Sequence, residues 1–181
     1  MQKLFQEPFN ISLILENVRS VYNVGSIFRT AEAFGVKRII LVGYSGIMIP
    51  ISSKDNRPTV LHPKLSKTAL GTEKIIPFKH FWATKKAIQH LRNQNGHPKI
   101  IALEQTEKSK SIFSFKYNNN FPLAIIVGNE KIGVSKQALK LADEIVEIPM
   151  FGKHNSLNVS VATSLFIFDL FQQAISSPNQ F

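Results

Sequence analysis

Short apolar runs alternate along this chain with segments whose apolar residues recur at the spacing of a helix. The runs predict strands at residues 11–16, 38–43, 73–78, 99–104, 122–128 and 144–150. The clearest helix lies between Asn23, its expected N-cap, and Gly35. Further helices are expected at residues 64–70, 80–92, 135–142 and 156–175, and a loop at residues 44–63. Buried strands between helices predict an α/β domain, with a mainly parallel sheet and helices on both faces.

The last helix has an alternative, because Leu157, Val159 and Val161 alternate as they would in a strand. About 20 residues without glycine or proline exceed the length of a strand, which favours the helix. Polar side chains enter this apolar segment at Asn155, Ser156 and Asn158. A buried amide or hydroxyl without a partner costs about 1–3 kcal/mol, so their presence here indicates a function.

The length and composition predict one globular domain over residues 1–181, in which 44% of the residues are apolar. The chain has no cysteine, and its five histidines lack the close spacing of metal ligands, so no metal is expected. Charged residues and a proline interrupt the first 15 residues, and no apolar run approaches the roughly 20 residues of a membrane span. We therefore expect a soluble, cytoplasmic protein without a membrane partner.

The charge is positive and unevenly distributed. The chain has 22 Lys and Arg residues against 12 Asp and Glu residues, a formal net charge of +10. The segment Lys54–Lys99 contains ten of the basic residues and only two acidic ones, Asp55 and Glu73. A basic surface attracts phosphates at long range, so contact with nucleic acid is favoured over a face that only aids solubility.

In parallel sheets ligands bind beyond the carboxyl ends of the strands, where this chain places polar and glycine-rich segments. One of them, VGNEKIGVS, contains Gly128, Gly133 and Ser135 at the spacing of a P-loop. Val134 stands where the P-loop requires the lysine that reaches the β- and γ-phosphates, which disfavours an NTPase. A glycine-rich turn with exposed backbone groups remains, and such a turn can hold the polar parts of a small ligand.

Three motifs in this order resemble the SpoU/TrmH-type RNA methyltransferases of the SPOUT superfamily. They are NVGSIFRTAEAFGV at Asn23–Val36, IVGNEKIGVS at Ile126–Ser135 and IPMFGKHNSLNVSVA at Ile148–Ala162. The segment KTALGTEKIIPF at Lys67–Phe78 also fits, and the likeness covers nearly the whole chain. The resemblance implies a C-terminal trefoil knot, in which the last strand and helix pass through an earlier loop, an exception to the rule against threaded loops. It also implies S-adenosylmethionine as cofactor and a homodimer with its active site near the subunit interface.

The resemblance assigns roles to eight residues. The cofactor-binding positions are Gly128, Ile148 and Leu157. The active-site positions are Asn23, Arg29, Glu130, Ser156 and Asn158. Structural alternatives exist for most of these: a helix cap at Asn23, Asn155 or Ser156, a pair of Arg29 with Glu32, and a solvated turn residue at Glu130.

The sequence therefore predicts an enzyme that methylates the ribose 2′-hydroxyl of structured RNA, with tRNA favoured over rRNA. Two alternatives remain, an RNA-binding protein on the same fold that has lost catalysis and a SPOUT methyltransferase that acts on a base. Because a guanidinium stays protonated, we expect Arg29 to bind a substrate phosphate and stabilise the developing alkoxide. That phosphate, or Glu130 through water, would relay the proton, and Ser156 and Asn158 would orient the ribose and the cofactor.

Overall fold

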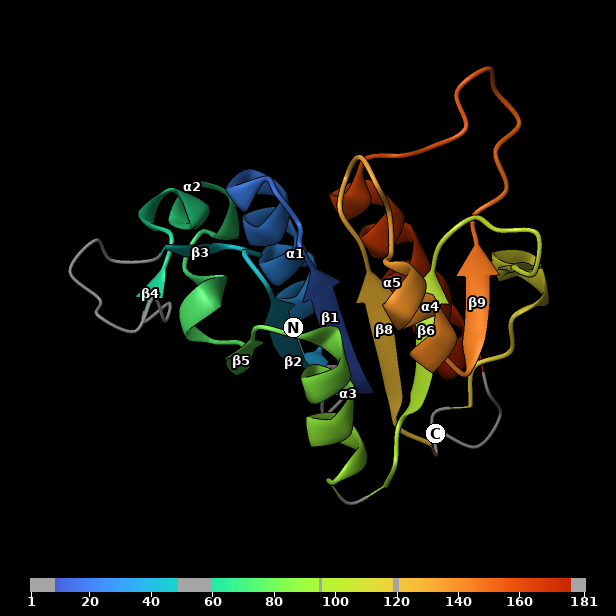
Figure 1. The fold of residues 1–181 in the computed structure, drawn as a ribbon, viewed down its shortest axis with the longest axis horizontal. Helices are drawn as coiled ribbons and strands as arrows, with labels where there is room; N and C mark the ends of the chain where they lie inside the picture. Colours follow the sequence, from blue (N-terminus) through green and yellow to red (C-terminus); the bar gives the residue numbers. More distant parts are fainter. Residues whose placement is uncertain (1–8, 49–59, 95, 119–120, 177–181) are drawn as a thin grey trace.

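A seven-stranded sheet forms the centre of the computed structural model, which describes residues 9–48, 60–94, 96–118 and 121–176. The strand order is β5-β2-β1-β8-β6-β9-β7, and every pairing described in this sheet is parallel (Figure 1). The strands are β1 Phe9–Glu16, β2 Val36–Val42, β5 Phe78–Phe81, β6 Lys99–Leu103, β7 Lys110–Ser111, β8 Leu123–Val127 and β9 Glu144–Glu147. The expected parallel α/β architecture is confirmed.

The strand β1 lies near the middle of the sheet because its side chains are apolar on both faces. Leu13, Ile14 and Leu15 follow one another in the sequence, and all three are fully buried. A continuous apolar run of this kind is typical of a parallel strand covered by helices on both sides. β1 pairs with β2 on one side and with β8 on the other.

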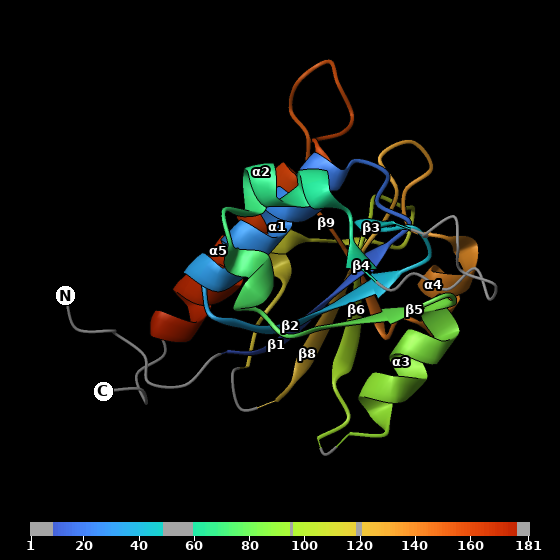
Figure 2. The same ribbon diagram turned by 90° about the vertical axis from the view of Figure 1, so that its left-hand side faces the viewer.

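Helices cover both faces of the sheet, as the sequence predicts (Figure 2). One face carries α1 and α5 over a core that includes Phe28, and the other carries α3 and α4 over a second core that includes Ile88. The hydroxyls of Thr30 in α1 and Ser164 in α5 are 2.9 Å apart, so these two helices lie side by side. The bounds are α1 Val21–Ala33, α3 Thr84–Arg92, α4 Lys136–Leu141 and α5 Val159–Ile175.

Short elements connect the longer ones. They are β3 Ile47–Met48 and β4 Val60–Leu61, which form a separate antiparallel pair, and η1 Pro63–Leu65, α2 Ser66–Ala69, η2 Thr72–Lys74 and η3 Ile112–Ser114. The expected loop at residues 44–63 lies partly outside the described residues. Within the described residues, no helix has the length and apolar character needed to cross a membrane.

The strand expected at residues 73–78 is wrong in position. Thr72–Lys74 forms a 3-10 turn instead, closed by a hydrogen bond of 3.0 Å from the Ile75 N–H to the Thr72 carbonyl. The strand β5 begins only at Phe78, which pairs with Ile39 of β2. Because β5 continues to Phe81, α3 begins at residue 84 and not at residue 80.

The beginnings of two helices also differ from the prediction. The N-cap of α1 is Ser20, whose hydroxyl accepts the Asn23 N–H at 3.3 Å, so Asn23 is not the cap. The last helix begins at Val159 and its N-cap is Asn158, not Asn155 or Ser156.

The segment before the last helix is exposed. Residues 151–158 are all exposed in this chain, although Leu157 keeps 41% of its surface accessible against 92% for Phe151. The burial cost expected for the polar side chains of this segment is therefore not incurred within one chain. The sequence argument that Asn155, Ser156 and Asn158 are buried is therefore wrong. Their position must be explained by the groups that they contact.

Candidate active site

The carboxyl ends of β1, β8, β6 and β9 lie at one edge of the sheet, and the segment between β9 and α5 extends beyond that edge (Figure 1). After β8 the chain makes a tight turn, in which the Asn129 N–H donates to the Gly133 carbonyl at 3.1 Å and the Gly133 N–H donates back to the Asn129 carbonyl at 2.8 Å. A Cβ atom on Gly128 would lie 2.2 Å from the carbonyl carbon of Gly133. Only glycine at position 128 allows this approach of two backbone segments.

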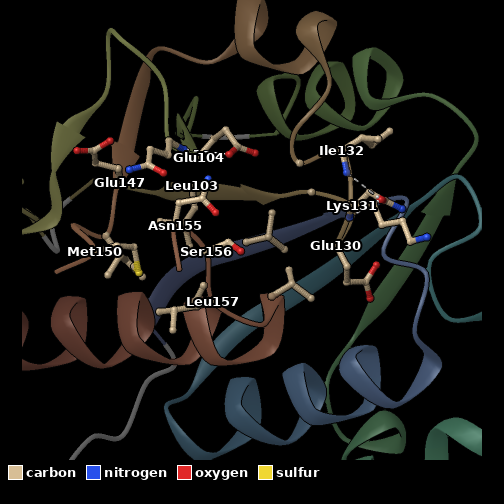
Figure 3. A pocket seen from close by; sticks show the side chains of 18 residues that line it. Leu103, Glu104, Glu130, Lys131, Ile132, Glu147, Met150, Asn155, Ser156 and Leu157 are labelled. Carbon is tan, nitrogen blue, oxygen red and sulfur yellow. Dashed lines mark hydrogen bonds between the residues drawn. The ribbon is translucent and has the colours of Figure 1, made fainter. Parts of the chain in front are cut away.

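A cavity of about 440 Å³ opens between this turn, the end of β6 and the segment that leads to α5 (Figure 3). Its lining comes from residues 103–105 and 127–133, from Glu147, Ile148 and Met150, and from residues 155–157 together with Val159 and Ala162. In Figure 3, Ser156 lies between Glu130 on one side and Met150 on the other. The cavity therefore brings together two of the three sequence motifs.

All three residues expected to bind the cofactor, Gly128, Ile148 and Leu157, line this cavity. Two of the five expected active-site residues, Glu130 and Ser156, line it as well. Within the described residues, no group of three or more His, Asp or Glu side chains is arranged to hold a metal ion.

A hydrogen-bonded series of side chains joins all three motifs. The Asn23 side chain donates from Nδ2 to Oε1 of Glu130 at 2.8 Å, and its Oδ1 accepts from Nδ2 of Asn158 at 3.2 Å. Asn158 in turn caps α5, because its Oδ1 accepts the Ser160 N–H at 2.8 Å. Asn23 thus links the turn after β8 to the start of the last helix.

The carboxylate of Glu130 is already occupied by hydrogen-bond donors. It accepts the backbone N–H groups of Arg19 at 2.8 Å and Ser20 at 2.9 Å, besides the Asn23 amide. Partial burial raises the pKa of Glu130, but the hydrogen bonds from Ser20, Arg19, its own N–H and Asn23 outweigh this effect and hold the pKa below its ordinary value. Glu130 is therefore an exposed turn residue whose carboxylate is held as an anion at the start of α1.

Arg29 lies apart from the other expected active-site residues of its own chain. It stands six positions after Asn23 in α1, which corresponds to about 9 Å along the helix axis. Its side chain is exposed, and it does not belong to the lining of the cavity. Within the described residues no ion pair joins Arg29 to Glu32, although both are exposed on α1.

Three polar residues of this region were not predicted from the sequence. Glu104 accepts the Val134 N–H at 2.7 Å, and buried Glu16 accepts the Ser135 N–H at 2.8 Å. The Asn129 side chain donates to the Asn17 carbonyl at 2.8 Å and to the Tyr44 hydroxyl at 2.9 Å. Each follows or ends a buried apolar strand, which is the signal by which sequence reasoning could have found them.

Residues 54–59 and 95 of the basic segment Lys54–Lys99 lie outside the described residues, and the rest of the segment contains both neutralised and unneutralised side chains. Arg92 forms an ion pair with Asp143 at 2.9 Å, and Lys99 forms one with Glu144 at 2.6 Å. Lys85 and Lys86 are exposed on α3, and the described part of the chain gives neither of them an acidic partner.

A parallel sheet with a cavity beyond the carboxyl ends of its strands is the arrangement of a ligand-binding α/β protein. The profile of the SpoU rRNA methylase family matches residues 10–168 of this chain. The chain therefore belongs to the SpoU rRNA methylase family, as its three motifs predict.

Two curated relatives are similar over most of the chain. A putative TrmH family tRNA/rRNA methyltransferase of Staphylococcus saprophyticus is 31% identical over 172 residues, 95% of this chain and 62% of that protein. The tRNA (guanosine(18)-2′-O)-methyltransferase of Escherichia coli K12 is 29% identical over 164 residues, 91% of this chain and 64% of that protein. The chain thus spans less than two thirds of the length of either relative.

The fold is similar to that of a solved SpoU methyltransferase. AviRb from Streptomyces viridochromogenes, in complex with the cofactor AdoMet, superimposes with a TM-score of 0.77 at 24% sequence identity. The match covers 96% of this chain and 60% of AviRb. At this level of identity the likeness establishes the fold.

Proposed function

We propose that this protein transfers the methyl group of S-adenosylmethionine to a ribose 2′-hydroxyl of structured RNA, with tRNA favoured over rRNA. The observation that carries the proposal is the meeting of all three motifs at one edge of the sheet, through the cavity and the hydrogen bonds of Glu130, Asn23 and Asn158. The activities named for the Staphylococcus saprophyticus and Escherichia coli relatives support RNA as the substrate.

The cavity fits the cofactor. Its volume of about 440 Å³ falls in the range of small-molecule sites, roughly 300–1,000 Å³. Gly128, Ile148 and Leu157 would hold S-adenosylmethionine there, largely through backbone groups and apolar contact. The bound cofactor supplies an electrophilic methyl group on a sulfonium. The AviRb complex with AdoMet supports this assignment for a protein of the same fold.

The residues of this chain would orient the ribose and manage its proton. The 2′-hydroxyl becomes a useful nucleophile only as its proton leaves. Glu130 is a poor acceptor for that proton, because its carboxylate already accepts three hydrogen bonds and its pKa is low. We therefore assign Glu130 a positioning role, exerted through Asn23, and propose that a substrate phosphate held by Arg29 relays the proton to solvent water. The planar guanidinium of Arg29 would also stabilise the alkoxide.

The working unit is proposed to be a homodimer. α5 and the residue before its cap expose an apolar stripe of Leu157, Val161, Leu165 and Phe168, each 41–46% accessible. The spacing of Val161, Leu165 and Phe168 places them on one face of α5, with Leu157 just before the cap, and such a face is commonly covered by a partner. Because Arg29 lies outside the cavity of its own chain, we propose that it reaches the active site of the other subunit.

Two further properties are proposed on the basis of family membership. We propose that the segment between β9 and α5 takes part in a trefoil knot, and that residues 1–181 form one domain. The incorporation of all the long strands into one sheet supports a single domain.

The decisive experiment is methylation of purified tRNA and rRNA with labelled S-adenosylmethionine, followed by mass spectrometry of the nucleosides. A 2′-O-methylated nucleoside that forms only with the protein is the expected product. A methylated base would instead support the base-directed alternative. Binding of RNA with no transfer to any RNA tested would support a protein that has lost catalysis.

Mixed dimers test the origin of Arg29. An Arg29→Ala protein and an Asn158→Ala protein should each have little activity alone. If Arg29 acts across the dimer, equilibrating the two should recover about a quarter of the wild-type activity, because a mixed dimer keeps one intact site. No recovery, with mixed dimers demonstrated by mass, would place Arg29 in the active site of its own subunit.

A further inference from the structure

We infer that Tyr44 and Trp82 form a stacking surface for RNA bases that neighbour the methylated nucleotide. This inference rests on the proposed function and adds to it a recognition site outside the cavity and its catalytic residues. Both rings are large, both are about half exposed, with accessibilities of 49% and 52%, and both leave the sheet at the edge where the cavity lies.

The sheet brings the backbones of Tyr44 and Trp82 close to each other. β2 and β5 are parallel neighbours in which Val42 is paired with Phe81, and the Gly43 N–H donates to the Phe81 carbonyl at 2.9 Å. Tyr44 and Trp82 follow within two residues of that pair, on adjacent strands that end together. Three strand spacings separate β5 from β8, which is about 14 Å between strand axes. An RNA strand with one nucleotide at the cavity would therefore need only a few more nucleotides to reach this surface.

Each ring is held in place by a polar partner. Asn129, which lines the cavity, donates from Nδ2 to the Tyr44 hydroxyl at 2.9 Å. The imidazole of His80 meets the Trp82 ring edge to face, with centroids 4.9 Å apart and an interplanar angle of 87°. His80 itself donates from Nε2 to the Gly43 carbonyl at 2.6 Å. Anchored rings lose little conformational entropy when a ligand stacks on them, which favours binding.

The positive charge beside Trp82 indicates that the ligand of this surface is a nucleic acid. Lys85 and Lys86 are exposed in the first turn of α3, which contains no acidic residue. Cations at the N-terminal end of a helix are unfavourable with respect to the helix dipole, so their presence needs another cause. Lysines that attract phosphates next to aromatic rings that accept bases are the combination used by proteins that bind single-stranded nucleic acid.

Trp82 is the only tryptophan of the chain, so its fluorescence reports directly on this surface. The wild-type protein is titrated with an RNA that it has been shown to methylate, or with tRNA if no such RNA has been found. Binding should quench the Trp82 emission and protect the ring from quenching by acrylamide. Addition of S-adenosylmethionine alone should leave the emission nearly unchanged. If RNA binds without any change in emission or acrylamide access, no base stacks on Trp82 and the inference is wrong.

Three variants give the test a graded outcome. Trp82→Leu keeps an apolar side chain but removes the ring, and should weaken RNA binding roughly 5- to 100-fold, the effect of losing one stacked base. Trp82→Phe keeps a smaller ring and should lose less. Phe113→Ala serves as the control, because Phe113 is 73% exposed next to β7 at the opposite edge of the sheet, and should bind RNA as the wild type does.

The outcomes separate this inference from the proposed function. If Trp82→Leu binds and methylates RNA like the wild type, the stacking surface is refuted while the methyltransferase stands. If the emission of Trp82 changes with protein concentration and not with RNA, a second copy of the chain covers the ring and the inference also fails. If the wild type methylates no RNA, the proposed function fails, whereas quenching by RNA still measures the surface itself.

Discussion

Replacing Glu130 by glutamine tests whether this carboxylate is a positioning anion. In the structure one oxygen accepts from the Ser20 N–H at 2.9 Å and the Asn23 amide at 2.8 Å, and the other accepts from the Arg19 N–H at 2.8 Å. A glutamine side chain offers only one acceptor oxygen. Its amide group would face at least one N–H donor, so at least one hydrogen bond is lost and two donors are set against each other.

The size of the effect follows from the number of bonds and their exposure. Hydrogen bonds to a charged group contribute about 1.5–3 kcal/mol each when they are buried. The side chain of Glu130 is exposed, and solvent reduces such contributions considerably. We therefore expect Glu130→Gln to lower the free energy of unfolding by about 1.5 kcal/mol, which corresponds to a Tm lower by about 3–6 °C in a chain of this size.

The pH dependence of this effect has a definite sign. The pKa of Glu130 is lower in the folded protein than in the unfolded chain, so its contribution to stability is present above the unfolded pKa of about 4.3 and is lost as the pH falls through the folded pKa. The difference in Tm between the wild type and Glu130→Gln should thus be full at neutral pH and shrink in acid.

Thermal unfolding followed by circular dichroism at neutral and acidic pH measures both quantities. Glu107→Gln is the matched control, because it removes the same charge from an exposed carboxylate to which the described part of the chain gives no hydrogen bond. The control should leave Tm close to the wild-type value. Equal Tm values for Glu130→Gln and the control at neutral pH would refute the positioning role, and a difference that persists unchanged in acid would refute the ionic origin.

Three further predictions concern the cofactor, catalysis and RNA. Gly128→Ala should abolish binding of S-adenosylmethionine in calorimetry, because the added Cβ would collide with the backbone of Gly133, whereas the wild type should bind it even with a chelator present. Arg29→Lys keeps the charge but loses the planar fork, so single-turnover methylation should fall to a small fraction of the wild-type rate while cofactor binding persists; near-normal turnover would defeat the argument. Replacing Lys85 and Lys86 together by alanine should weaken RNA binding and flatten its salt dependence without changing cofactor affinity, and an unchanged salt slope would show that neither contacts phosphate.

The strands that position the cavity were predictable because each is a compact apolar run bounded by polar residues. β1, β6 and β8 needed no more than this pattern, whereas β9 has the sequence EIVE and ends at Glu147, three residues before the predicted end. The error at residues 73–78 has a different origin, since Ile75 and Ile76 form part of an apolar run without belonging to a strand. In the turn formed by residues 72–74 and closed by hydrogen bonds to the Thr72 carbonyl, Ile75 remains 64% exposed and Ile76 is buried. The pattern of hydrophobic residues alone therefore does not predict this turn.

The motifs contain Asn23, Glu130 and Asn158, which hydrogen bonds join in the structure, but they did not predict what each of these side chains contacts. Asn23 is a residue type that is common at N-caps, yet Ser20 caps the helix. The Asn23 amide instead forms hydrogen bonds with Glu130 and Asn158. The partners of that amide lie 107 and 135 residues away in the chain, so no local pattern could predict them. Glu130 and Asn158 each hold the beginning of a helix, α1 and α5 respectively, and Asn23 connects the two. The loss of any one of these side chains would therefore remove a contact that joins the turn after β8, the start of α1 and the start of α5.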